Sequence, residues 1–209
     1  MPIQGRRKPP LSGVADMIVG VDEAGRGPLA GPVVAAAVLL CKPRPSGLDD
    51  SKKLTAARRA ELEDTIKRRC QWAVGVVEVE DIDRLNIFGA TMLAMTLAVE
   101  ALCVKLGCDP LEVLIDGNMT PAGRRPEWRW TARAIVGGDA IEPCISAASI
   151  IAKEHRDRMM CTAAQQHALY GWEKNKGYGT PDHLAALRTH GPTPLHRKSF
   201  APVSQLILL

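Results

Sequence analysis

The sequence predicts an α/β domain, and three observations support that prediction. Short runs rich in Val, Ile, Leu and Ala alternate with longer segments in which apolar residues recur at helical spacing. Helix-capping residues stand at the boundaries of those longer segments. No internal repeat and no linker divides residues 16–209, so we expect a single domain that follows a flexible, basic N-terminal tail over residues 1–15.

Five of the apolar runs are expected to be strands. Their expected ranges are 17–21, 33–40, 72–79, 112–115 and 131–136. The first runs into Asp22-Glu23, the fourth into Asp116, and the fifth into Gly137-Gly138-Asp139. The segment between the last two, residues 117–130, is rich in Arg, Pro and Trp and is expected to be a long loop.

Four longer segments are expected to be helices. Their expected ranges are 56–70, 87–106, 146–164 and 181–190. Thr55 and Thr180 precede two of these segments and are suited to cap their N-termini. Gly107 and Gly191 follow two of them and are expected to end the helices.

Composition and charge bear on the partners of the protein and on its expected compartment. The 209 residues carry a formal net charge of +4, which permits a nucleic-acid partner without requiring one. From residue 151 onward there are eight Lys and Arg against four Asp and Glu. The six cysteines form no Cys-x-x-Cys pair and residues 1–10 resemble no signal peptide, so the cytoplasm is the expected compartment. No apolar run approaches the roughly 20 residues that span a bilayer, so no membrane association is expected.

Acidic residues follow three of the expected strands, at Asp22 with Glu23, at Asp116 and at Asp139. An α/β sheet places functional groups beyond its strand ends, so these carboxylates could meet at one place. Packed carboxylates repel each other, and such a cluster is stable only if cations lie among them. Oxygen ligands without His or Cys favour Mg²⁺ or Mn²⁺ over Zn²⁺. The alternative interpretation is that these acids are solvated turn residues.

The first acidic pair raises a geometric problem. Neighbouring residues on a regular strand point to opposite faces, so Asp22 and Glu23 could not both face one metal site on such a strand. Gly20 before them, and Gly25 and Gly27 after them, would let the backbone bend there. We therefore expect a departure from regular strand geometry at these two acids.

A glycine-rich turn follows the first acids, with the sequence GRGPLA at residues 25–30. On paper it matches the G-x-G-x-x-A dinucleotide-binding fingerprint. That fingerprint must open a helix, whereas a β-branched run follows here, and the preceding acids would lie beside a pyrophosphate. Glycines also let backbone groups approach a ligand closely, and a ribose 2′-OH distinguishes RNA from DNA. The turn is therefore better suited to reading that hydroxyl.

Several motifs occur in a distinctive order. They are DEAGRGPLAG at 22–31, DSKKL at 50–54, LNI at 85–87, IDGN at 115–118, ISAASI at 145–150, KGYGT at 176–180 and HRKSF at 196–200. In this order, over about residues 17–203, the set resembles the ribonuclease HII family. The resemblance implies a ribonuclease H-like fold, with a mixed central sheet flanked by helices and a helical C-terminal extension.

The resemblance also implies an activity and the residues that perform it. The activity would be metal-dependent endonucleolytic hydrolysis of the RNA strand of RNA–DNA hybrids, including single ribonucleotides embedded in duplex DNA. Two ions, Mn²⁺ or Mg²⁺, would act together and leave a 5′-phosphate. The carboxylates that would bind metal and act in catalysis are Asp22, Glu23, Asp116 and Asp139. The residues that would contact substrate are Gly25, Arg26 and Gly27 at the 2′-OH, Ser51, Lys52 and Lys53 at phosphates, and Tyr178, expected to be exposed, on the sugar of the following deoxynucleotide.

Two features depart from the family pattern. Gly138 stands where family members often have Lys, and the insert at residues 120–130 is longer than usual, so the assignment of Asp139 crosses an insert. The insert contains three Arg and two Trp. It is either a solvated loop with its Trp residues packed on the core or an edge that contacts phosphates.

Three further hypotheses stay open at this point. Ser149 and Lys153 would be neighbours on one helix face, as in a Ser–Lys hydrolase dyad, although a small Ser in an Ala-rich helix is more often a packing choice. The tail Gln205–Leu209 resembles short peptides by which bacterial replication proteins bind the sliding clamp; alternatively its leucines pack in a last helix. The competing function is a non-catalytic binder of hybrids or structured RNA. A monomer is expected.

Overall fold

The central sheet has five strands in the order β3-β2-β1-β4-β5. The computed structural model describes residues 17–49, 51 and 53–207, so the predicted tail over residues 1–15 lies outside the described residues. The strands are β1 Ile18–Ala24, β2 Val33–Leu39, β3 Gln71–Val77, β4 Glu112–Asp116 and β5 Ala132–Ile135. β1, β2 and β3 pair antiparallel, whereas β1, β4 and β5 pair parallel. The predicted mixed sheet is confirmed.

The helices agree with the predicted ones and add to them. They are α1 Ala56–Arg69, α2 Val79–Leu106, α3 Gly138–Ile141, α4 Pro143–Gln166, α5 Trp172–Asn175, α6 Pro181–His190 and α7 Ala201–Ile207, with a 3₁₀ turn at Ala168–Tyr170. Thr55 caps α1 and Thr180 caps α6, because each hydroxyl accepts a hydrogen bond from the backbone N–H three residues ahead. Gly107 and Gly191 end α2 and α6 as expected.

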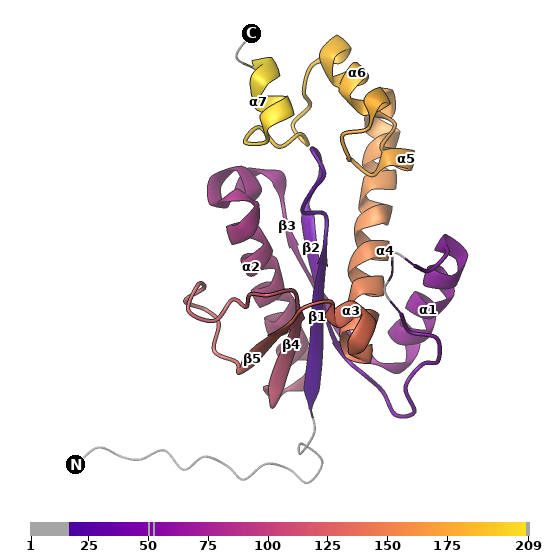
Figure 1. Cartoon of the computed structure of the whole chain (residues 1–209), viewed down its shortest axis with the longest axis vertical. Coiled ribbons are helices and arrows are strands. Elements are labelled where there is room, and N and C mark those ends of the chain that lie inside the picture. Colours follow the sequence, from indigo (N-terminus) through magenta and orange to yellow (C-terminus); the bar gives the residue numbers. More distant parts are fainter. Residues whose placement is uncertain (1–16, 50, 52, 208–209) are drawn as a thin grey trace, which may run out of the picture.

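Helices cover both faces of the sheet (Figure 1). On one face α2 packs over the sheet around a core that includes Val19, Val21 and Ile115. On the other face α4 crosses β1 and β2, and α1 packs beside it. The elements that follow α4 lie at the end of the sheet towards which β1 runs (Figure 1). The predicted helical C-terminal extension is confirmed, and it packs on the glycine-rich turn through residues such as Leu29.

Helix α2 begins earlier than predicted and contains a break. In this part of the chain the sequence predicted a helix over residues 87–106, but α2 already starts at Val79. Its first segment ends at Asn86, whose φ of 57° and ψ of 168° are not helical. The Asn86 Oδ1 accepts hydrogen bonds from the backbone N–H groups of Phe88 (2.9 Å) and Gly89 (3.1 Å). Asn86 therefore acts as the N-cap of the second segment.

Helix α2 is also long and apolar enough to cross a membrane by length and composition, which contradicts the expectation that no apolar run approaches that length. However, 56% of its most apolar window is buried. Its buried residues, among them Met95, Ala98 and Leu102, pack in the core against the sheet. These contacts are typical of the core helix of a folded domain.

Two cysteines form a disulfide that the sequence analysis did not predict. Cys41, just after β2, bonds Cys70, the residue that ends α1, and their Cα atoms are 4.7 Å apart. Spacing alone could not predict this pair, because residues 29 apart meet only through the packing of α1 on the sheet. The other four cysteines are free thiols, at Cys103, Cys108, Cys144 and Cys161.

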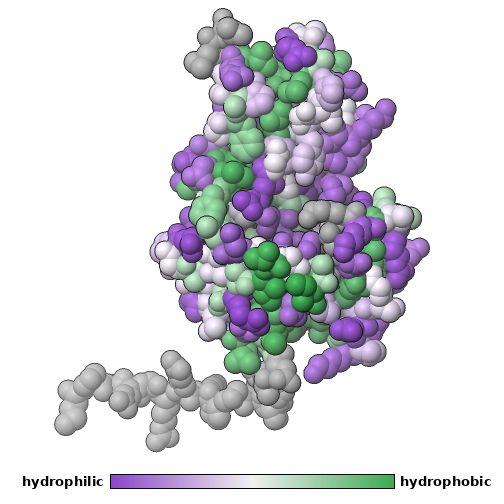
Figure 2. Space-filling model, viewed as in Figure 1, coloured by the Kyte–Doolittle hydropathy of each residue, from purple (hydrophilic) through white to green (hydrophobic). Residues whose placement is uncertain are grey.

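The Arg- and Trp-containing insert packs its aromatic residues on the core. Trp128 and Trp130 are 8% and 5% exposed, and their rings meet edge-on with centroids 5.1 Å apart. This packing agrees with the first of the two alternatives for the insert, a loop whose Trp residues pack on the core. Figure 2 shows a mostly hydrophilic face with a hydrophobic patch over β5 and α3, where Val136 and Ile141 are the strongly exposed apolar residues.

Candidate active site

Three aspartates gather where β1 and β4 separate. The two parallel strands pair as far as Val21 and Ile115, and Asp22 and Asp116 are the next residue on each. Asp139 joins them from the first turn of α3 rather than from the end of a strand, where it was expected. Carboxylate oxygens of Asp22, Asp116 and Asp139 all lie within 4.8 Å of one another. The sequence prediction that acids distant in the chain meet at one place is therefore right for these three.

Backbone contacts fix the short helix that carries Asp139. The Asp139 backbone N–H donates to Asp116 Oδ1 over 3.3 Å. The Ser146 hydroxyl donates to the Asp139 carbonyl oxygen, which links α3 to the first turns of α4. Gly138 fits this corner because a Cβ there would lie 2.6 Å from Ile145 Cδ1. The chain thus folds tightly around the third carboxylate.

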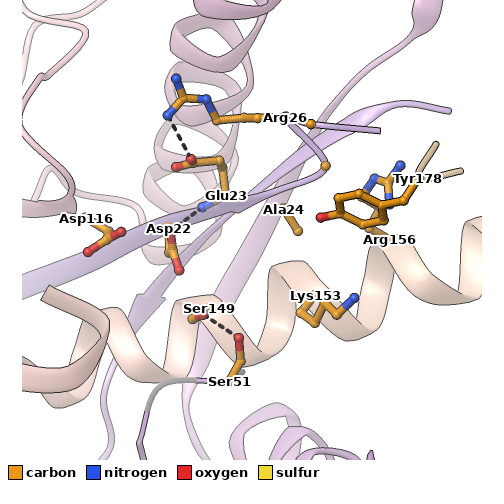
Figure 3. Close-up of a pocket in the computed structure, with 12 residues that line it drawn as sticks. Asp22, Glu23, Ala24, Arg26, Ser51, Asp116, Ser149, Lys153, Arg156 and Tyr178 are labelled. Carbon is orange, nitrogen blue, oxygen red and sulfur yellow. Dashed lines mark hydrogen bonds and ion pairs between the residues drawn. The ribbon is translucent and has the colours of Figure 1, made fainter. Parts of the chain in front are cut away.

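Glu23 lies on the other face of β1. Val19 and Val21 face the core beneath α2, so Glu23, two residues on, faces the same side, whereas Asp22 faces α4 (Figure 3). β1 stays in regular register with β2 through Ala24. The expected bend at the two acids is therefore wrong. Glu23 still borders the same pocket as Asp22, because β1 has already separated from β4 at this point.

The carboxylates make the site strongly unfavourable for negative charge. Burial first, and then the nearby carboxylates of Glu23 and Asp116, raise the pKa of Asp22 well above its usual value. Asp22 is only 5% exposed, and its Oδ1 accepts from the Glu23 backbone N–H over 2.7 Å. A bound cation would offset this repulsion. The donor set, which is carboxylate oxygen without His or Cys, fits Mg²⁺ or Mn²⁺.

Two buried arginines hold the glycine-rich turn beside these acids. Arg197 donates to the carbonyl oxygens of Gly25 (2.6 Å), Arg26 (3.0 Å) and Gly31 (2.8 Å). Arg156, 1% exposed on α4, donates to the carbonyl oxygens of Ala30, Pro32 and Lys176. The sequence analysis did not assign a role to either arginine. Their partners are backbone carbonyl groups, which every residue has, so the spacing of residue types in the sequence could not indicate these contacts.

Gly25 must be glycine at this position. Its φ is +97°, and a Cβ there would lie 2.0 Å from Arg156 Nε. Arg26 points outward, with its Nη1 3.4 Å from Glu23 Oε1. All three residues of the Gly25-Arg26-Gly27 turn line the same pocket as Asp22 and Asp116.

Tyr178 lies across the pocket from the aspartates (Figure 3). Tyr178 is 46% exposed, as predicted, and its Cε1 would lie 3.6 Å from a Cβ at Gly27. The backbone N–H of Leu29 donates to the Gly177 carbonyl oxygen over 2.8 Å, which joins the glycine-rich turn to the segment that carries Tyr178. The structure thus brings these two sequence motifs together.

A pair of fully buried histidines supports Tyr178. The Thr193 backbone N–H donates to His196 Nδ1 (2.9 Å), so the proton of His196 is on Nε2, which faces His183 Nε2 at 3.1 Å. Trp172 also donates to His183 Nε2, which leaves His183 Nδ1 to donate to the Tyr178 carbonyl oxygen (2.8 Å). Burial lowers the pKa of His183, and that of His196 to about 4, so both rings are neutral near pH 7.

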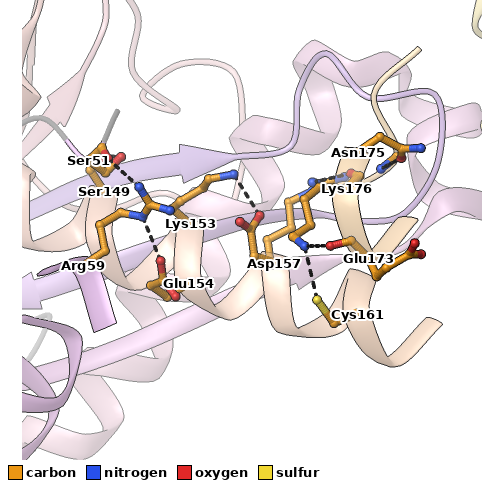
Figure 4. A network of polar contacts seen from close by, with 12 residues as sticks. Ser51, Arg59, Ser149, Lys153, Glu154, Asp157, Cys161, Glu173, Asn175 and Lys176 are labelled. Atoms are coloured by element: carbon orange, nitrogen blue, oxygen red, sulfur yellow. Dashed lines mark hydrogen bonds and ion pairs between the residues drawn. The ribbon is translucent and has the colours of Figure 1, made fainter. Parts of the chain in front are cut away.

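The segment around residue 51 lies along α4. Ser51 is 4% exposed and shares a hydrogen bond of 2.8 Å with Ser149 (Figure 4). Arg59 fixes the segment by donating to the Ser51 carbonyl oxygen (3.2 Å) and to Glu154 (2.8 Å). Lys53 is exposed and lies 3.4 Å from Asp49, and the predicted phosphate contact Lys52 lies outside the described residues.

Ser149 and Lys153 also line the pocket, but their contacts differ from those of a hydrolase dyad. The Ser149 hydroxyl bonds Ser51, and it lowers the pKa of Asp22, against the larger effects that raise it. The Lys153 ammonium pairs with Asp157 over 2.9 Å. Ser149 therefore supports the acidic cluster, a role that the sequence analysis did not assign.

Comparison with known proteins decides the family. A family model described as ribonuclease HII matches residues 19–203. The chain belongs to the ribonuclease HII family. A ribonuclease HII from Novosphingobium aromaticivorans is 80% identical over 193 residues, which cover 91% of this chain and 98% of that protein. One from Erythrobacter litoralis is 69% identical over 188 residues, which cover 90% of this chain and 89% of that protein.

The fold agrees with solved structures of the ribonuclease HII family. A chain in the structure of the PCNA:RNase HII complex from Archaeoglobus fulgidus superposes with a TM-score of 0.71 at 26% identity, and the match covers 91% of this chain and 96% of that one. The predicted ribonuclease H-like fold is therefore confirmed. As a member of this family the chain is a metal-dependent ribonuclease H, an endonuclease that acts on RNA–DNA hybrids.

Proposed function

We propose that this enzyme cleaves on the 5′ side of a ribonucleotide, including a single ribonucleotide embedded in duplex DNA, and leaves a 5′-phosphate. The observation that carries the proposal is the gathering of Asp22, Asp116 and Asp139, because Asp22 and Asp116 line one pocket together with the glycine-rich turn and Tyr178. A phosphate placed on the aspartates would lie within reach of groups suited to examine the sugar next to it.

The four carboxylates Asp22, Glu23, Asp116 and Asp139 would hold two divalent cations, Mg²⁺ or Mn²⁺. When bound, the ions would activate water and stabilise the leaving 3′ oxygen. Asp22 is our choice for the carboxylate shared by both ions, because Glu23 and Asp116 both act on its pKa. Glu23 would contribute from the α2 face of β1.

Other residues of the chain would select and hold the substrate. The Gly25-Arg26-Gly27 turn would read the 2′-OH through backbone groups, because Arg197 and Arg156 already hold the surrounding carbonyls in place. Tyr178 would pack on the sugar of the following deoxynucleotide. Ser51, Lys52 and Lys53 would contact phosphates.

The test is a DNA duplex that carries one ribonucleotide. We expect a single nick on the 5′ side of the ribonucleotide when Mg²⁺ or Mn²⁺ is present and none with EDTA, as resolved by mapping the products on a denaturing gel. Tyr178→Ala should lower kcat/KM by roughly 10- to 100-fold, because one stacking contact is worth about 1–3 kcal/mol.

An all-DNA duplex is the control substrate and should remain intact. Strong, salt-dependent binding without a metal-dependent nick would contradict the proposal and favour a non-catalytic hybrid binder. A nick at another position would preserve the ribonuclease activity but overturn the proposed site of cleavage.

We also propose that the C-terminal residues bind the sliding clamp. The related A. fulgidus chain is in a complex with PCNA. In α7, Gln205 is exposed, whereas Val203 is buried and Leu206 packs against the C-terminal core. Residues 208–209 of the candidate peptide Gln205–Leu209 lie outside the described residues, as does the side chain of Ile207.

Removal of Leu208 and Leu209 together with Gln205→Ala should weaken binding to a bacterial sliding clamp at least about tenfold, as measured by titration. This variant keeps Val203 and Leu206, the described residues of α7 that pack in the C-terminal core. Leu187→Ala, which alters that core alone, is the matched control. Unchanged clamp affinity in the truncated variant would exclude the proposed peptide.

The domain organisation, oligomeric state and location of the protein are also proposals. We propose that residues 16–209 form one catalytic domain. We propose a monomer located in the cytoplasm. Sedimentation of the purified chain would test the proposed monomer.

A further inference from the structure

A second, smaller pocket lies on the α2 side of β1. Apolar side chains from α2 and from the loop after β4 form its walls, and carboxylates form one end. The lining residues that matter here are Phe88, Met92, Met95, Met119, Glu23 and Asp116. Phe88 and Met119 are 36% and 39% exposed, so they present apolar surface at its mouth.

The two pockets are continuous through shared residues. Glu23, Arg26 and Asp116 border both of them. One pocket therefore opens towards α4 and Tyr178, and the other towards α2 and Phe88, with the acidic cluster between them. A nucleic-acid strand whose phosphate lies on that cluster therefore has a pocket on each side of that phosphate.

The backbone holds Phe88 in its exposed position. Asn86 has a positive φ of 57°, which is uncommon for a residue with a side chain, and caps the helical segment whose first turn contains Phe88. The break in α2 therefore sets where Phe88 lies. An exposed aromatic residue whose position is set by the unusual backbone conformation of Asn86 is better suited to contact a ligand than to fill a core.

We propose that this second pocket binds the nucleotide on the 5′ side of the scissile phosphate, with Phe88 and Met119 against its sugar and base. The inference rests on the proposed function, in which Tyr178 takes the nucleotide on the 3′ side. The apolar walls suit the C–H faces of a sugar or the face of a base.

The experiment measures how much the upstream strand contributes to binding. Asp22→Asn protein, which should bind without cleaving, is titrated with two duplexes of the same length. In the first duplex, the strand that carries the ribonucleotide has further nucleotides on the 5′ side of that ribonucleotide. In the second duplex, that strand begins at the ribonucleotide, which carries a 5′-phosphate. We expect the upstream nucleotides to tighten binding about five- to tenfold in this protein, and less than about twofold once Phe88→Ala is added.

Leu97→Ala is the matched control, because Leu97 is on the same helix with 37% exposure but does not line the pocket. With this change the five- to tenfold contribution should persist. An equal contribution in the Phe88→Ala and Leu97→Ala proteins would overturn the second pocket alone. Equal affinity of Asp22→Asn protein for ribonucleotide-containing and all-DNA duplexes would instead overturn the proposed function, and the inference with it.

Discussion

Asp22→Asn should abolish cleavage and at the same time stabilise the metal-free protein. The amide removes a metal-binding charge, and we expect kcat to fall on the order of 10³-fold or more. The same change removes the buried charge that Glu23 and Asp116 repel. We therefore expect the free energy of unfolding without metal to rise by about 1 kcal/mol or more, which is roughly 2–4 °C in Tm for a chain of this size.

The pH dependence of stability follows from the direction of the Asp22 pKa. The folded protein holds this proton more tightly than the unfolded chain does, because the pKa of Asp22 is raised on folding. Metal-free wild-type protein should therefore lose stability as the pH rises from about 4 through the raised pKa. The Asp22→Asn protein should lack this loss.

Thermal melts at several pH values, with and without Mg²⁺ or Mn²⁺, measure both effects. Divalent ions should raise the Tm of wild-type protein and leave that of Asp22→Asn nearly unchanged. Asp64→Asn, at an exposed carboxylate paired with Arg68, is the matched control and should behave as wild type. Full turnover by Asp22→Asn, or by Asp116→Asn, would show that the metal-site assignment is wrong.

Sequence patterns predicted the parts of the site that depend on local order. Asp22 and Asp116 follow apolar runs, and the apolar runs themselves identify buried strands. Parallel neighbours in a sheet bring their carboxyl ends together, so the meeting of these acids followed from fold class. The caps Thr55 and Thr180 were predicted for the same reason, because a cap acts on residues next to it.

The parts that were missed depend on contacts between distant segments. Arg197 and Arg156 hold the glycine-rich turn through carbonyl oxygens more than 120 residues away in the chain. The Cys41–Cys70 disulfide forms only when α1 packs on the sheet. The regular register at Asp22 and Glu23 was missed because glycine permits a bend without requiring one, and pairing with β2 keeps the strand straight.

Gly20→Ala should have the largest effect on folding. Gly20 lies in β1 beneath the first turn of α4, where a Cβ would lie 2.2 Å from the Cys144 carbonyl carbon and 2.4 Å from the Ile145 nitrogen. Both are backbone atoms, so no side chain can rotate away, and α4 must move off the sheet. We expect the free energy of unfolding to fall by about 3 kcal/mol or more, or roughly 6–12 °C in Tm.

The same displacement should damage the active site in molecules that remain folded. β1 carries Asp22, whereas α4 carries Ser149 and Arg156, which support the acids and the glycine-rich turn from the other side. A misplacement of about 1 Å between such groups can cost on the order of 10²-fold in rate. Cleavage measured well below the reduced Tm should therefore still be impaired.

Gly89→Ala is the matched control for stability. It makes the same chemical change in helix α2, where the nearest neighbour of the new Cβ would be the Leu85 Cβ at 3.3 Å. Alanine is preferred over glycine inside a helix by about 1 kcal/mol, which opposes the cost of this close contact, so this variant should be destabilised far less than Gly20→Ala. If Gly20→Ala and Gly89→Ala had the same Tm, α4 would not pack on β1 as closely as the described contacts require. The alignment of Asp22 with Ser149 would then need another cause.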